Sequence, residues 1–97
     1  MTTEVIERKT FAEVLDYAYG GIATFRLTNR KDDESMLTVW QINGIGITSY
    51  PIYKYTKAKS KGFLGFFKKD IILGECLDVT TNFNKAVNIF AEALKVA

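Results

Sequence analysis

The sequence predicts an α+β domain in which an N-terminal helix, about four antiparallel strands and a C-terminal helix follow one another, with both helices on one sheet face. Segments near both ends of the chain carry apolar residues at helical spacing, and segments between them alternate with period two. The length of 97 residues fits one hydrophobic core and not two. We therefore treat residues 1–97 as a single domain.

The first helix is expected to begin after Thr10 and to end at Gly20-Gly21. Thr10 and Glu13 have the spacing of a capping box, in which a hydroxyl and a carboxylate each cap a free backbone amide. Glycines after the last helical turn favour termination. The apolar residues at helical spacing between these signals are Phe11, Val14, Leu15 and Ala18.

Two strands are expected next, over residues 22–29 and 36–42, with a polar turn at 30–34 between them. The alternation in the second strand places Met36, Thr38, Trp40 and Ile42 on one face and Leu37, Val39 and Gln41 on the other. Trp40 is interpreted as a core residue rather than an interface anchor, because its strand neighbours are apolar. Asn43-Gly44 predicts a tight turn, since both residues tolerate positive φ.

The remaining elements are a strand within residues 45–56, a strand over 71–79 and a helix over 82–95. Pro51 has no amide to donate to a ladder, so the first of these strands is expected to start after it or to lie at a sheet edge. Thr80 or Thr81 is the expected cap of the closing helix. Its apolar stripe consists of Phe83, Ala86, Val87, Phe90, Ala93 and Leu94.

Catalytic chemistry has little support in this sequence, and we predict that the protein is not an enzyme. Histidine, the commonest general base and transition-metal ligand, is absent. Cys76 has no histidine to activate it and is interpreted as a small buried apolar residue. The acidic run 32–34 is interpreted as a solvated turn, and no glycine pattern matches a phosphate-binding loop. We therefore expect no catalytic residue, metal or cofactor and no small-molecule substrate.

A cytoplasmic location is expected. The sequence has no apolar run near the ~18–20 residues that a membrane span requires, and its first ten residues contain no apolar signal core. The lone cysteine cannot form an internal disulfide, which agrees with a reducing compartment.

Residues 50–69 form the most unusual stretch, because they hold six lysines and six aromatic residues without one acidic residue. Their positive charge contrasts with a net charge of −2 over residues 1–50. We name this stretch the Lys/aromatic segment. The candidate partner-binding residues within it are Tyr53, Tyr55, Lys57, Lys59, Lys61, Phe63, Phe66, Phe67, Lys68 and Lys69.

The Lys/aromatic segment is open to three interpretations. Tyr53 and Tyr55 share one strand face and could stack on the bases of a single-stranded nucleic acid while lysines attract its phosphates. Alternatively, the phenylalanines of residues 63–67 could fill a cleft on a protein partner or enter an anionic membrane surface. The third interpretation is structural, with rings in the core and lysines guarding a sheet edge. We favour a non-enzymatic protein that binds a protein partner or itself, with single-stranded nucleic acid as the alternative and a membrane surface less favoured.

Two local resemblances accompany this reading. Residues 11–27 resemble the helix followed by "ATFTL" that opens small proteins of unassigned role in phages and mobile elements, and residues 85–94 are similar to their closing helix. This resemblance covers about a third of the chain and implies an accessory protein. Residues 61–67 are similar to the KGFLG segment of the Jag amino-terminal domain. The GXXG loop of the KH modules found beside that domain is absent, so no function is carried over from it.

Overall fold

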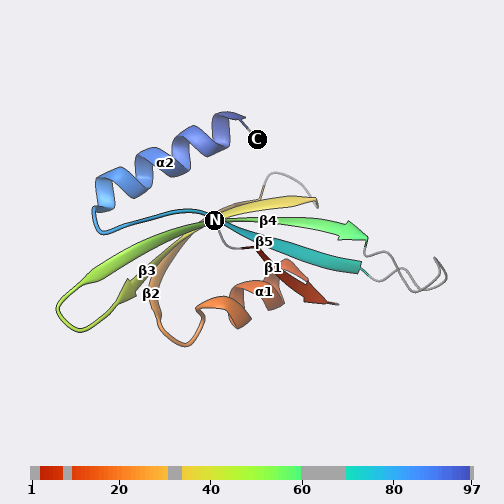
Figure 1. Ribbon diagram of the computed structural model, residues 1–97, viewed down its shortest axis with the longest axis horizontal. Coiled ribbons are helices and arrows are strands. Elements are labelled where there is room, and N and C mark those ends of the chain that lie inside the picture. The colour runs from red at the N-terminus through yellow and green to blue at the C-terminus, as the bar shows by residue number, and fades with distance from the viewer. Residues whose placement is uncertain (1–2, 8–9, 31–33, 60–69, 97) are drawn as a thin grey trace.

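We analysed a computed structural model of the chain, which describes residues 3–7, 10–30, 34–59 and 70–96. Within these ranges the chain forms five strands and two helices (Figure 1). In chain order they are β1 (Thr3–Glu7), α1 (Phe11–Ala18), β2 (Ala23–Arg30), β3 (Ser35–Asn43), β4 (Thr48–Lys59), β5 (Asp70–Thr80) and α2 (Phe83–Val96). The predicted α+β class is confirmed.

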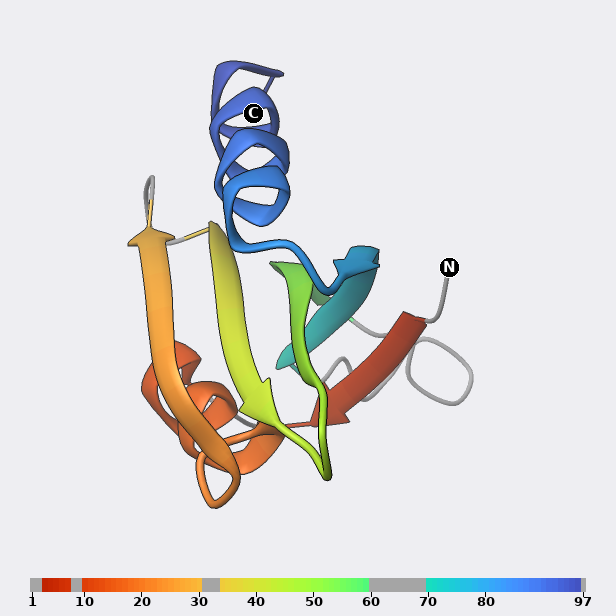
Figure 2. The same ribbon diagram turned by 90° about the vertical axis from the view of Figure 1, so that its left-hand side faces the viewer.

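All neighbouring strands are antiparallel, and their order in the sheet is β1-β5-β4-β3-β2. The first and second strands therefore lie at opposite edges, and α1 connects them by crossing the sheet (Figure 2). The sequence reasoning missed β1. Of its apolar residues, Val5 is exposed and Ile6 is buried. One buried apolar side chain does not produce the alternation of apolar and polar residues by which a strand is recognised in a sequence.

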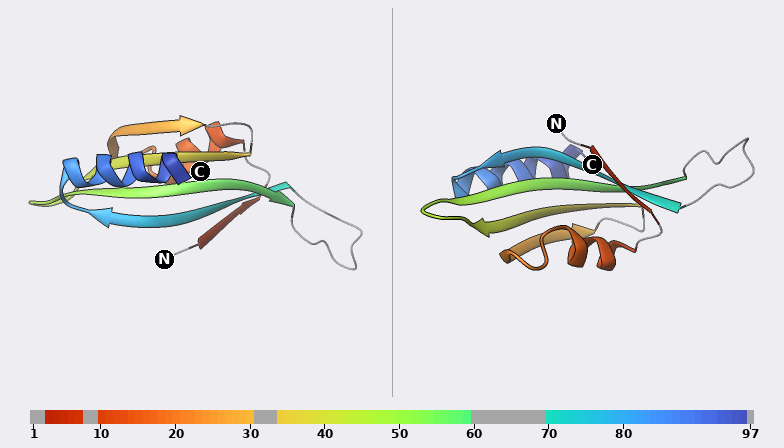
Figure 3. Two further views of the ribbon diagram at one scale, coloured as in Figure 1. Left: turned by 90° about the horizontal axis from the view of Figure 1, so that it is seen from above. Right: turned by 60° about the horizontal axis from the view of Figure 1, so that its bottom comes forward.

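The two helices lie on opposite faces of the sheet, whereas the sequence analysis placed both on one face (Figure 3). Residues Phe11 and Val14 of α1 pack in a cluster with Trp40 and its same-face neighbours. Ala86 and Phe90 of α2 pack in a second cluster with Val39 and its neighbours. The helices are thus separated by the thickness of the sheet.

The physical reason for this arrangement lies in β3, where residues 36–40 are buried without interruption. Successive side chains of a strand point to opposite faces, so an uninterrupted buried run needs cover on both sides. One helix layer could remove only half of these side chains from water. The predicted assignment of β3 residues to two faces agrees with the membership of the two clusters.

Both helices begin at side-chain caps. The predicted capping box of α1 is present, with the Thr10 amide donating to Glu13 Oε2 at 2.7 Å and the Glu13 amide donating to Thr10 Oγ1 at 3.2 Å. At α2 the cap is Asn82, whose Oδ1 accepts from the Lys85 amide at 3.0 Å. Thr80, an expected cap, instead accepts from the Asn82 amide at 3.2 Å.

Pro51 lies inside β4, which is a central strand, so the prediction of an edge position or a later start is wrong. The β3–β4 register pairs Val39 with Ile52 and Ile42 with Ser49, and it assigns no pair at Pro51 itself. A proline lacks the amide that a ladder bond needs, so the sheet accepts it through a local gap in one ladder. Pairing with β5 continues there, with Pro51 opposite Val79.

The β3–β4 turn closes slightly later than the expected Asn43-Gly44 turn. The Gly44 amide donates to the Ile47 carbonyl at 2.7 Å, and the positive φ falls on Gly46, at 74°. Glycine adopts this left-handed conformation at little cost. Within the described ranges, neither helix combines the length and the apolar character needed to cross a bilayer.

The placement of the helices on opposite faces predicts additive effects of mutations. Val14→Ala on α1 and Phe90→Leu on α2 are each expected to lower the free energy of unfolding by about 1–2 kcal/mol, because each removes buried apolar volume. The two sites belong to different clusters, so the double variant should equal the sum within about 0.5 kcal/mol. Urea denaturation measures these differences.

The control for this experiment is a pair within one cluster, Val14→Ala combined with Ile6→Val. Because these two residues pack in the same cluster, the effect of the double variant on the free energy of unfolding is expected to differ more from the sum of the single effects. A coupling between Val14 and Phe90 as large as that of the control pair would contradict the two-sided arrangement.

Candidate functional site

A pocket of about 300 Å³ opens on the α1 face of the sheet. It lies between the C-terminal end of α1 and strand β4, and four of the five described residues that line it are tyrosines. The described lining residues are Tyr17, Ala18, Tyr19, Tyr53 and Tyr55. We call this cavity the tyrosine pocket.

Strand β4 supplies the floor of the pocket. Tyr53 and Tyr55 are two residues apart on a strand and therefore point to the same face. Their rings lie nearly parallel, at 16° with centroids 5.7 Å apart. They are only 8% and 0% exposed, so packing holds both rings in place.

The end of α1 supplies the wall. The chain leaves the helix in a tight turn in which the amides of Ile22 and Ala23 both donate to the Tyr19 carbonyl, at 3.1 and 2.7 Å. This turn directs the Tyr19 ring to the sheet, where it meets Tyr53 edge-on at 5.9 Å. The two hydroxyls are 3.4 Å apart and can share one hydrogen bond. Tyr17 stands at the rim and is 67% exposed.

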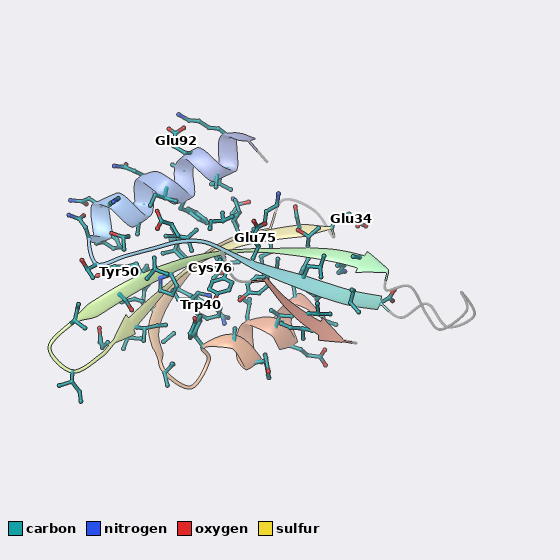
Figure 4. The ribbon with its side chains drawn as sticks, viewed as in Figure 1. Glu34, Trp40, Tyr50, Glu75, Cys76 and Glu92 are labelled. Atoms are coloured by element: carbon teal, nitrogen blue, oxygen red, sulfur yellow. The ribbon has the colours of Figure 1, made fainter. Side chains whose placement is uncertain are left out.

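Trp40 supports the wall from the adjacent strand (Figure 4). Its ring is fully buried and contacts Tyr19 edge-on at 5.4 Å. The Arg26 guanidinium lies 5.9 Å from the centre of the same indole. Trp40 Nε1 is buried and makes no hydrogen bond within the described residues, so ring contacts hold this side chain. The pocket is therefore continuous with the aromatic core of the α1 face.

The described lining of the pocket carries no charged side chain. Its chemistry is that of aromatic faces and phenolic hydroxyls, and a hydroxyl can both donate and accept a hydrogen bond. Of the basic residues on the same face, Arg26 stacks on Trp40, and Lys57 Nζ lies 5.0 Å from the centre of the Phe11 ring. The more exposed Tyr17 and Tyr19 rings can hold a ligand by stacking, and the phenolic hydroxyls can form hydrogen bonds with it.

The structure places three of the predicted partner-binding residues. Tyr53 and Tyr55 are buried at the pocket floor, and Lys57 is exposed on the same face. The backbone of Lys59 belongs to β4. The Lys59 side chain lies outside the described residues, as do Lys61, Phe63, Phe66, Phe67, Lys68 and Lys69. Their role as a partner-binding surface stays a prediction.

Burial of the two strand tyrosines bears on the nucleic-acid interpretation. Base stacking needs an exposed ring face, and Tyr53 and Tyr55 are packed against each other in the core of the α1 face. Neither ring therefore offers a wide exposed face, and the nucleic-acid interpretation stays a prediction. The prediction that both rings share one face is correct, and both rings belong to the buried cluster of that face.

Tyr17, Ala18 and Tyr19 were not among the predicted site residues. Tyr17 lies off the apolar stripe of the first helix, so its spacing alone gives no reason to select it. The signal that could have found the site is the density of tyrosines at 17, 19, 53 and 55. Bringing the two pairs together requires knowing that α1 ends above β4, and spacing along the chain does not contain that information.

Other chemistry is not assembled in the described part of the chain. No group of three or more acidic or cysteine side chains that could hold a metal ion occurs there. Cys76 is partly buried beside the aromatic cluster, and its thiol donates to the Asp78 carbonyl at 3.7 Å. Its neighbours are apolar and aromatic, which agrees with the expected packing role.

Comparison of this chain with protein-family models, with curated proteins and with solved structures finds no match. The two local resemblances noted in the sequence therefore stay predictions.

Trp40 offers a direct test of the pocket wall, because it is the sole tryptophan of the chain. Tyr19→Ala should admit water to the indole, so the emission maximum is expected to move to longer wavelength and acrylamide quenching to increase. Steady-state fluorescence of the folded variant measures both effects.

Tyr17→Ala is the matched control. This residue lines the same pocket, but the ring contact with Trp40 comes from Tyr19. Its removal should leave the emission unchanged. Equal shifts in the two variants would mean that Tyr19 is not the residue that shields Trp40.

Proposed function

We propose that this chain is a non-enzymatic binding protein that takes one side chain of a protein partner into the tyrosine pocket. The observation that carries the proposal is the convergence of four tyrosines from α1 and β4 around a cavity of about 300 Å³. Tyrosine is enriched in protein interfaces, because it offers a large rigid contact area and a hydroxyl at a low entropic cost.

The size of the cavity supports a side chain as the occupant. A volume near 300 Å³ is at the lower end of the range for ligand pockets, about 300–1,000 Å³. One anchor side chain that enters a preformed pocket commonly dominates the energy of a protein interface. The floor is preformed here, because Tyr53 and Tyr55 are buried, and the exposed Tyr17 ring extends the contact area beyond the cavity.

Arginine is the side chain that this pocket suits best. A guanidinium is planar, stacks on aromatic rings and donates to hydroxyls and carbonyls. The pocket adjoins the C-terminal end of α1, which carries the negative end of the helix dipole. That helix has no basic residue in its last turn to offset the dipole, and the exposed Asp16 adds a further negative charge.

The lysines of the Lys/aromatic segment have a separate role in this proposal. They would attract acidic groups on the partner and raise the rate of association. A partner that presents an arginine among acidic residues would satisfy both features. The proposal thus keeps the predicted protein-binding role of the lysines and adds residues 17, 19, 53 and 55 as the central contact with the partner.

Titration with N-acetyl-arginine methylamide tests the proposal. Millimolar binding is expected for one isolated side chain, with amide chemical-shift changes at Tyr17–Tyr19 and Tyr53–Tyr55. The citrulline analogue has the same shape without the charge and should bind at least threefold more weakly. Heteronuclear NMR measures both affinities and maps the residues affected.

Tyr17→Ala is expected to weaken binding of the arginine probe about tenfold, equivalent to about 1.4 kcal/mol, through loss of one stacking surface. Val79→Ala removes an exposed apolar side chain on β5 and serves as the control. If neither probe perturbs the pocket residues, or if Tyr17→Ala leaves the affinity unchanged, the proposed function is wrong.

A further inference from the structure

Strand β2 presents an open edge. Its one strand neighbour in the described sheet is β3, on the inner side (Figure 2). All six residues from Thr24 to Asn29 are exposed. Backbone amides and carbonyls on the outer side of such a strand are a template for pairing with another strand. Proteins that use an edge in this way add a strand from a second chain.

We propose that β2 pairs antiparallel with β2 of a second copy of this chain, about a two-fold axis that passes beside Leu27. The two five-stranded sheets would then form one continuous sheet. This inference rests on residues outside the tyrosine pocket and is independent of the proposed function.

The apolar residues of β2 support this register. Phe25 and Leu27 point to the α2 face, since Leu27 is opposite Val39, and they are 40% and 38% exposed. An axis beside Leu27 places it against the partner's Leu27 and places Phe25 against the partner's Asn29. The two leucines would cover each other, with a phenylalanine on either side. The ring centroids of Phe83 and Phe25 are 6.4 Å apart, so α2 covers part of the Phe25 ring. Pairing would bury apolar area that α2 leaves exposed to solvent.

The charges of β2 select the same register. With the axis beside Leu27, Arg26 is opposite the partner's Thr28. An axis one residue later would place Leu27 against the partner's Asn29 and lose the apolar pair, and an axis one residue earlier would place Arg26 against itself. Like charges directly opposite destabilise a strand pair. The Arg26 guanidinium also lies over its own Trp40, away from the outer edge.

The symmetry of the pair explains why β2 is preferred to the other edge. A contact between β2 and the partner's β1 joins two different surfaces and would continue into a filament, whereas a β2–β2 contact closes after two copies. Strand β2 has eight residues and β1 has five, so the symmetric pair also forms the longer ladder. A closed dimer removes the exposed edge that would otherwise favour aggregation.

Cysteine cross-linking tests the register, in a Cys76→Ala background to remove the native thiol. Leu27→Cys should form a disulfide-linked dimer under mild oxidation, since opposed residues have suitably spaced Cβ atoms. Phe25→Cys should not link to itself, because the two copies of that residue are offset by four positions, about 13 Å along the strand. A mixture of Phe25→Cys and Asn29→Cys proteins should form a disulfide-linked heterodimer, because these two positions are opposite each other in the proposed register.

Sedimentation velocity tests the association itself. The native chain is expected to be a dimer at ~100 μM, and Leu27→Lys should weaken the dimer at least tenfold by placing two ammonium groups opposite each other. Val79→Lys is the control, because Val79 is 55% exposed on β5, which β4 and β3 separate from β2, and should leave the dimer intact. A monomeric native chain, or Phe25→Cys linking to itself as fast as Leu27→Cys, would overturn the inference.

Discussion

The central constraint on this molecule is that its inner strands are apolar on both faces. Trp40 and Tyr55 are fully buried on one side of the sheet, and Ile52 is fully buried on the other. A sheet of this kind cannot leave either face in water, because each fully buried large apolar side chain contributes about 1.5–3 kcal/mol to folding. The chain meets the constraint with one helix on each face. Its N-terminal helix serves as the crossover between the two sheet edges, and its C-terminal helix folds back from β5.

The tyrosine pocket follows from the modest length of α1. Eight residues extend over part of the aromatic face, and the helix then ends in a turn around the Tyr19 carbonyl. Beyond the end of the helix, Tyr17 and Tyr19 lie next to Tyr53 and Tyr55 and shield these two rings from solvent. The Tyr19 ring meets Trp40 and Tyr53 edge-on, at interplanar angles of 65° and 69°, and the pocket lies beside it. The pocket is thus a consequence of how the core of this face is closed.

Sequence reasoning succeeded where one element determines the pattern and failed where two elements must be placed together. The alternation that separates Trp40 from Val39 is local, and so is the capping box of α1, and both are confirmed. Which face a helix covers depends on the connection between distant strands, so the prediction of one shared face did not anticipate the crossover. Pro51 was assigned by a rule for regular ladders, but a gap in one ladder accommodates it. The position of Tyr19 above β4 is likewise a tertiary relationship, so its role could not be recognised.

The two proposed surfaces differ in the part of the sheet that they use. Pairing at β2 uses an outer backbone edge and side chains on the α2 face, whereas the tyrosine pocket lies on the α1 face. The two surfaces are linked through side-chain contacts from Arg26 to Trp40 and from Trp40 to Tyr19. Arg26 is exposed, whereas Trp40 and Tyr19 are held by the contact between their rings. A substitution at Leu27 changes none of these contacts, and a substitution at Tyr17 lies at the rim, outside them. Loss of one surface therefore leaves the other intact, which makes the pocket and the edge separable by single substitutions.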